Sequence, residues 1–436
     1  MGNNINRGSF VNRGYAAIIS GMKDSIVKSI AKIFSTQIIS YVFQILSGIV
    51  IARTLGPEGK GQVAVVFSFV GAFVGFSQFG IPLSNVYYLN KGINKNVLYS
   101  NTLLFSICVS LILIISALIS LPYARETYFK GISPIYIYVS LSILLISNLR
   151  PHLLAFLRGL EEYGFFNGSS LVLNIGRFVF LLIFLSFFSL DVDLAILSFV
   201  IAGTLSVAYT FIAAGKHLKI SRRFLDIKQF KKNLNFGLRE YLGGVINKVN
   251  LNIDLLILAI FFPSGVIGVY SVAQALVNLL NFIPDSLGVV LVPLMVKLDD
   301  SNKSRVLKNS VSFNVLIYLI CWVVFFFFGR LLIRFLYGES FVEAYQYVNI
   351  LFIGALFLGL TKMFNKYFTS KGKPEIKSIT RVIILPVKVL LMYFLIKYHG
   401  LVGAAWSWAL TSFFLFVVTV GFYIYQKQII KNNPDE

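Results

Sequence analysis

The sequence predicts an all-α polytopic membrane protein. Of its 436 residues, 57% are hydrophobic and only 13% are charged, and the mean hydropathy is +0.79. A soluble globular domain carries roughly a quarter charged residues, so a soluble enzyme is excluded, as is a disordered chain, which needs low hydrophobicity. A membrane β-barrel is excluded as well, because its strands alternate apolar and polar residues, whereas stretches of about 20 residues are apolar throughout here.

Hydropathy and helix-breaking residues divide the chain into about twelve spans, each close to the roughly 20 residues that cross a bilayer. Their approximate limits are 33–52, 62–88, 97–120, 135–156, 166–189, 194–214, 236–262, 266–292, 309–329, 343–365, 377–397 and 401–425. The second span is expected to break at Gly80 and Pro82, and kinks are expected at Pro284 and Pro386, because proline lacks a backbone donor.

Lysine and arginine are distributed unevenly between the two ends of these spans. With the N-terminus in the cytoplasm, 29 of the 39 fall in cytoplasmic segments, 7 on the other side and 3 within spans. Because cytoplasmic loops collect Lys and Arg, we expect a multi-pass protein of the cytoplasmic (inner) membrane with both termini inside. The same rule explains the net charge of +21 without nucleic acid as a partner.

The predicted spans form two six-helix halves. Residues 1–214 are the predicted N-lobe, residues 215–235 a basic cytoplasmic linker, and residues 236–436 the predicted C-lobe. The linker is either an amphipathic helix on the inner leaflet or a solvated loop. Gly61 and Gly268 are 207 positions apart, and Gly159 and Gly372 are 213 apart. Both offsets are close to half the chain, which predicts a parallel repeat about an axis along the membrane normal.

No catalytic constellation is visible in the sequence. The three histidines and two cysteines are scattered, and no HExxH, GxSxG or P-loop motif is present. We therefore expect no catalytic residue, no metal and no cofactor, and we predict a transporter rather than an enzyme.

Polar residues inside spans are costly and usually face a cavity or another helix. At 100° per residue they share one face on several predicted spans. These sets are Asn167, Ser170, Asn174 and Arg177; Asn247, Asn250 and Asp254; Gln274, Asn278 and Asp285; and Lys377, Arg381 and Lys388. The pattern predicts a bundle around a water-accessible lumen, and hydrogen bonding between helices is the alternative for the uncharged groups.

Five charged residues are expected deep in the membrane, where each charge costs about 2.5–3.5 kcal/mol. They are the cations Arg177, Lys248 and Lys388 and the acids Asp254 and Asp285. Their excess of positive charge suits an anionic head group such as pyrophosphate, which guanidinium binds bidentately. Arg177 and Lys388 are 211 positions apart, so they are expected to hold this group from opposite lobes. The predicted head-group site comprises Arg177, Lys248, Lys388, Asn174, Asn247, Asn250, Gln274 and Asn278.

The two acids, Asp254 and Asp285, are candidates for coupling transport to a proton or sodium gradient, since intramembrane acids often serve as relays. Structural ion pairs, such as Lys248 with Asp254 or Asp285 with Lys388, are the alternative. The sequence leaves both roles open.

The segment from Ile51 to Gly61 reads IARTLGPEGKG. With Arg53, Gly56, Pro57 and Gly61, it resembles the "ARxLGPxxxG" signature that follows the first helix of polysaccharide transporters. These are the O-antigen and capsule flippases of the multidrug/oligosaccharidyl-lipid/polysaccharide (MOP) exporter superfamily. The RGL turn at 158–160 is similar to a second segment of that family, and the length and duplication fit along the whole chain.

The resemblance implies a V-shaped, MATE-like fold that flips an undecaprenyl-pyrophosphate-linked oligosaccharide by alternating access, for O-antigen, capsule or exopolysaccharide. Membrane lipid, a polysaccharide polymerase and a chain-length regulator are the partners it implies. A cation-coupled multidrug exporter is the first alternative, and the basic interior argues against it. A membrane glycan polymerase or ligase is the second, and the short predicted outer loops argue against it.

Overall fold

The computed structural model describes residues 7–127, 129, 134–296, 298–373 and 375–432. Every regular element in these ranges is helical, as the sequence predicts. The helices are α1 (Arg7–Gly75), α2 (Ile81–Asn90), α3 (Lys95–Thr127), α4 (Pro134–Gly159), α5 (Tyr163–Phe187), α6 (Val192–Gly215), η1 (Arg222–Phe224), α7 (Ile227–Phe261), α8 (Ser264–Leu280), α9 (Phe282–Val296), α10 (Asp300–Tyr337), η2 (Glu339–Phe341), α11 (Ala344–Ser370) and α12 (Glu375–Asn432).

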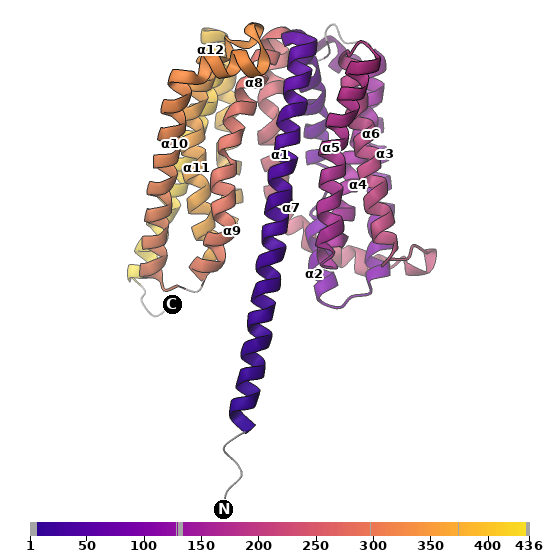
Figure 1. Cartoon of the computed structure of the whole chain (residues 1–436), viewed down its shortest axis with the longest axis vertical. Coiled ribbons are helices and arrows are strands. Elements are labelled where there is room, and N and C mark those ends of the chain that lie inside the picture. Colours follow the sequence, from indigo (N-terminus) through magenta and orange to yellow (C-terminus); the bar gives the residue numbers. More distant parts are fainter. Residues whose placement is uncertain (1–6, 128, 130–133, 297, 374, 433–436) are drawn as a thin grey trace, which may run out of the picture.

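These helices form two bundles that stand side by side (Figure 1). One bundle contains α2 to α6, the other contains α8 to α12, and α1 and α7 lie between them. Helix α1 packs along both α5 and α8, and α7 packs along both α2 and α12, so these two helices join the bundles. The predicted all-α, two-lobe architecture is confirmed, whereas the side of the membrane on which the termini lie stays a prediction.

Glycines mark the turns within the two longest helices. Gly56 in α1 has φ 64° and Gly400 in α12 has φ 58°, and each interrupts the helical backbone. Glycine adopts positive φ at little steric cost. Both turns fall between neighbouring predicted spans, so α1 and α12 each consist of two helical segments.

Two predicted breaks are present. Gly80 has φ 67°, and α2 begins at Ile81 with proline in its first turn. The eighth predicted span divides into α8 and α9 just before Pro284, which lies in the first turn of α9. By contrast, α12 continues as helix through Pro386, and its non-helical residue is Gly400.

Nine helices in the described part of the chain are long and apolar enough to cross a membrane. Two of them, Ser35–Gly75 and Glu375–Gln428, have 41 and 54 residues and contain the turns described above. Helix α7 is not among the nine because its apolar stretch is confined to Asn252–Phe261. The figure of about twelve spans therefore stays a prediction.

The outer helices expose the side chains that suit a hydrocarbon environment. On α10, Phe327, Phe328, Leu331 and Phe335 are 62–72% exposed. Large contiguous apolar surfaces of this kind mark membrane contact. Together with the apolar helices, they identify a multi-pass membrane protein.

Helix α7 begins inside the predicted linker and ends in the predicted C-lobe. The backbone N–H and C=O of Asp226, just before α7, bond the side-chain amide of Asn101 on α3 at 3.1 and 2.9 Å. Ten residues beyond this anchor, Phe236 of α7 stacks on Tyr87 of α2 with ring centres 4.3 Å apart. The first half of α7 thus packs against the N-terminal bundle, and the lobe boundary at 235 stays a prediction.

Candidate functional site

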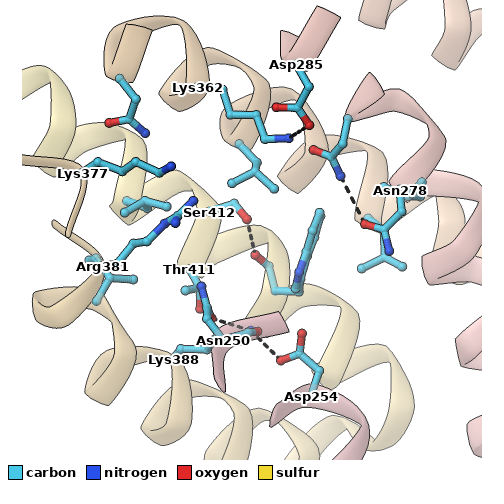
Figure 2. Close-up of a pocket in the computed structure, with 18 of the residues that line it drawn as sticks. Asn250, Asp254, Asn278, Asp285, Lys362, Lys377, Arg381, Lys388, Thr411 and Ser412 are labelled. Atoms are coloured by element: carbon cyan, nitrogen blue, oxygen red, sulfur yellow. Dashed lines mark hydrogen bonds and ion pairs between the residues drawn. The ribbon is translucent and has the colours of Figure 1, made fainter. Parts of the chain in front are cut away.

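A cavity of about 480 Å³ lies in the C-terminal bundle (Figure 2). Its walls come from α7, α8, α9, α11 and α12, and Tyr41 contributes from α1, which lies between the bundles. Its charged and amide residues are Asn250, Asp254, Gln274, Asn278, Asn281, Asp285, Lys362, Asn365, Lys366, Lys377, Arg381 and Lys388. The cavity therefore collects the predicted polar faces of the seventh, eighth and eleventh spans.

The lining contains five cations and two acids. Each acid pairs with one cation: Asp254 with Lys388, and Asp285 with Lys362, both at 2.8 Å. Lys388 therefore pairs with Asp254 and not with Asp285, so that sequence-based pairing is wrong, whereas the pairing of Lys248 with Asp254 falls on a side chain outside the described residues. The two ion pairs join α7 to α12 and α9 to α11. Helical periodicity shows which residues of one helix share a face, but it does not show which helices pack together, so it could not predict these pairs.

Three lining cations, Lys366, Lys377 and Arg381, form no ion pair with any acid among the described residues. They lie close enough to one another that Lys377 is repelled by both of the others. Asp285 attracts Lys377 and Arg381 at longer range, but it already pairs with Lys362. The wall formed by α11 and the start of α12 is therefore strongly positive.

The two ion pairs differ in burial. Lys388 and Asp254 have side chains that are only 3% and 4% exposed, and the Lys388 ammonium also donates to the backbone and side-chain oxygens of Asn250, each at 2.8 Å. Lys362 and Asp285 are 18% and 55% exposed. The first pair is part of the protein interior, and the carboxylate of the second is more than half exposed.

Amide side chains cover the opposite part of the cavity. Asn281 donates to Asn278 at 3.2 Å, and Gln274 lies one helical turn before Asn278 on α8. Amides offer both donors and acceptors, so this wall is suited to uncharged polar groups such as hydroxyls.

Arg177 lies elsewhere, on α5 in the N-terminal bundle, and is not part of the cavity lining. Its guanidinium carbon is 5.3 and 5.4 Å from the ring centres of Phe67 and Phe199. Its Nε atom is buried without a hydrogen-bond partner among the described residues, and Lys60 is near enough to repel it. The structure thus does not bring Arg177 and Lys388 into one cavity, although Arg177 and Lys60 form a second positive centre.

The remaining predicted residues fall into two groups. Asn174 donates to the backbone oxygen of Ser170 on its own helix at 2.9 Å, so it lies near Arg177 rather than in the cavity. Asn247 and Lys248 belong to α7, but their side chains lie outside the described residues.

Sequence reasoning missed Lys60, Lys362 and Lys366. The last two are four residues apart on α11, as are Lys377 and Arg381 on α12. Residues four apart share a helix face. Two basic pairs of this spacing, at neighbouring ends of consecutive predicted spans, could therefore have predicted the positive wall of α11 and α12.

The motif turn after the first span is a contact between the two bundles. A Cβ atom at Gly61 would overlap the backbone oxygen of Ser264, and one at Gly268 would overlap that of Pro57. Gly61 and Gly268, the glycines at the predicted repeat offset, therefore face each other where α1 crosses α8.

Arg53 of the same motif extends this contact between the bundles. Its Nε donates to the backbone oxygen of Leu336 at 3.0 Å, and a terminal nitrogen donates to that of Phe335. It thus caps the C-terminal end of α10, where the helix dipole favours a positive charge.

A family described as "Polysaccharide biosynthesis protein" matches residues 26–299, well over half of the chain. The chain belongs to this family. It is 23% identical over 380 residues to an inferred O-antigen transporter of Shigella flexneri, and the match covers 83% of this chain and 88% of the relative.

Two solved transporter structures are similar to this chain in fold. The lipid II flippase MurJ in an inward closed conformation has a TM-score of 0.75 at 15% identity, with 90% of this chain and 87% of MurJ covered. An inward-facing multidrug resistance MATE transporter of the MOP superfamily has a TM-score of 0.73 at 15% identity, covering 90% of this chain and 95% of that one.

These findings confirm the resemblance to polysaccharide transporters of the MOP superfamily. The relatives are transporters and flippases, not enzymes, so the second alternative, a glycan polymerase or ligase, is set aside. The fold is shared by a lipid II flippase and a multidrug resistance transporter, so the choice between a flippase and a drug exporter depends on the chemistry of the cavity.

Proposed function

We propose that this polysaccharide biosynthesis family member flips an undecaprenyl-pyrophosphate-linked oligosaccharide across the cytoplasmic membrane, as a repeat unit of O-antigen, capsule or exopolysaccharide. The observation that carries the proposal is the positive wall of the cavity, defined as Lys366, Lys377 and Arg381, which no described acid neutralises. A pyrophosphate carries the negative charge that this wall lacks, and Arg381 can bind it bidentately.

The other walls support the same substrate class. The amides of Asn250, Gln274 and Asn278 provide donors and acceptors for sugar hydroxyls. The polyprenyl tail would stay in lipid between the two bundles while the head group crosses, and one bundle would rock against the other to alternate access. Arg177 and Asn174 would meet the head group from the N-terminal bundle during that movement.

A multidrug exporter is the second candidate, and the MATE-like fold is the observation that favours it. Organic cations are the substrates that an acidic lumen would attract. In this cavity both acids are already paired and three cations remain, so an organic cation would be repelled. We therefore rank this candidate below the flippase.

Coupling to a proton or sodium gradient belongs to the same proposal. Asp285 is the better candidate for that role, because its side chain is 55% exposed, whereas Asp254 is buried against Lys388. A polysaccharide polymerase and a chain-length regulator are the proposed partners, and anionic lipid is the proposed contact of the basic segment 215–235.

The test is a deletion strain of the host complemented with variants of the positive wall. Deletion should cause a lipid-linked oligosaccharide to accumulate on the cytoplasmic leaflet, and the Lys377→Gln/Arg381→Gln variant should fail to clear it. Lys397→Gln is the matched control, since Lys397 lies on the same helix but outside the cavity lining. Clearance by the double variant at the wild-type rate would contradict the proposal, and so would a deletion that causes drug sensitivity without accumulation.

A further inference from the structure

The buried ammonium of Lys388 is surrounded by oxygen atoms (Figure 2). A carboxylate oxygen of Asp254, the side-chain oxygen of Asn250 and the backbone oxygen of Asn250 each lie 2.8 Å from its nitrogen. These three oxygens come from one turn of α7, whereas the ammonium comes from α12. One positive charge is therefore held by a carboxylate, an amide and a backbone oxygen inside the bundle.

The oxygen types match those that hold small hard cations. Carboxylates, amide oxygens and backbone carbonyls are the ligands of such ions in proteins, and transporters bind sodium with backbone carbonyls near the membrane midplane. The site contains one carboxylate and one positive charge, so it is neutral when it holds a single monovalent cation. A divalent ion would leave an uncompensated charge in a buried place.

Further oxygens lie around this site. The hydroxyl of Tyr270 is buried within electrostatic range of Asp254, and that of Thr411 is buried on the cavity wall. Neither hydroxyl has a hydrogen-bond partner among the described residues. The ammonium therefore leaves two buried hydroxyls of this part of the bundle without a hydrogen-bond partner.

We propose that Lys388 is a built-in substitute for a bound sodium ion. Its ammonium fills the site between α7 and α12 that a diffusible monovalent cation would otherwise occupy. Because the ammonium is covalently attached, the contact between α7 and α12 does not depend on the sodium concentration. The proposal rests on the geometry of this cluster and not on the identity of the transported substrate.

The proposal has a direct consequence. Removing the lysine side chain should leave a vacant site with a carboxylate and several oxygens, and this site should bind sodium. The full-length Lys388→Ala protein in lipid nanodiscs is the test, with its thermal unfolding midpoint measured in sodium chloride and in choline chloride at equal ionic strength. The probe is sodium ion alone.

We expect the wild-type midpoint to be the same in both salts. The midpoint of Lys388→Ala should be lowered in choline and raised by sodium in a saturable way, by several degrees. Asp254→Asn/Lys388→Ala should lose the sodium response because the carboxylate is gone. Lys362→Ala is the matched control: it also frees an acid, but Asp285 is 55% exposed and should gain no sodium response.

Equal midpoints of Lys388→Ala in the two salts would overturn the proposal, and so would a wild-type protein stabilised by sodium as strongly as the variant. Lys388→Ser, which retains a ligand oxygen, provides a second variant and should respond in the same way. If neither variant yields folded protein in sodium chloride, sodium cannot replace the ammonium and the proposal is wrong.

Discussion

Removing one charge of the buried pair should destabilise the protein far more than removing both. Lys388 and Asp254 are 3% and 4% exposed, with 2.8 Å between their charged atoms. Leaving one member of such a pair without its partner costs about 3–5 kcal/mol, while replacing both charges is often close to neutral. We therefore expect Asp254→Asn and Lys388→Met each to lose about 3–5 kcal/mol of unfolding free energy.

The double variant Asp254→Asn/Lys388→Met should lose much less than the sum of the two. In the double variant the side-chain oxygen of Asn250 still loses the hydrogen bond from Lys388. A buried acceptor without a donor costs about 1–3 kcal/mol of unfolding free energy, which is the loss expected for the double variant. The assay is equilibrium unfolding of the full-length proteins in choline buffer, followed by tryptophan fluorescence, because Trp408 lines the cavity.

The exposed pair serves as the control for this cycle. Asp285→Asn and Lys362→Met should each cost about 1 kcal/mol or less, because the 55% exposed carboxylate is solvated. Two results would refute the reasoning that Asp254 and Lys388 are a buried, mutually dependent ion pair. One is a double variant whose loss of unfolding free energy equals the sum of the two single losses, and the other is a loss below about 1 kcal/mol for Asp254→Asn.

Three further predictions concern the bundle contacts and the N-terminal positive centre. Gly61→Val should cost about 1–3 kcal/mol through overpacking against the Ser264 carbonyl, measured beside Gly421→Val, where an added Cβ meets nothing within 4 Å. Arg53→Gln should open the contact between α1 and the C-terminal end of α10. A single cysteine introduced at this end of α10, in a protein without its native cysteines, should then react faster with an impermeant maleimide. An unchanged rate would argue that Arg53 does not cap α10. Arg177→Lys should retain more transport than Arg177→Ala at equal membrane levels, because a point charge only partly replaces the planar guanidinium, and equal transport by both would exclude an anion-binding role.

The sequence predicted the architecture because the relevant signals are local. Apolar stretches of span length mark the helices, and Gly56, Gly80 and Gly400 adopt the positive φ values that turns require. Gly61 and Gly268, which the repeat offset relates, form a close contact between α1 and α8, while the repeat itself stays a prediction.

The candidate site was only partly predictable. Helical periodicity places Asn250, Asp254 and Lys388 on polar faces, but it cannot tell which face meets which, because the partners are more than a hundred residues apart in the chain. Periodicity therefore allowed a pairing of Lys388 with Asp285, whereas the structure pairs Lys388 with Asp254. Arg177 was placed opposite Lys388 from the repeat offset alone, although aromatic rings of α1 and α6 enclose it.

The most direct test of the central claim, that the cavity is an anion site for a lipid-linked head group, is a binding measurement. Purified full-length protein in nanodiscs would be titrated with undecaprenyl pyrophosphate, with undecaprenol, which has the same tail without phosphate, and with an organic cation. The account predicts binding of the pyrophosphate lipid that weakens with salt and is lost in Lys377→Gln/Arg381→Gln, but not in Lys397→Gln. Equal binding of undecaprenol, or preferential binding of the cation, would contradict it.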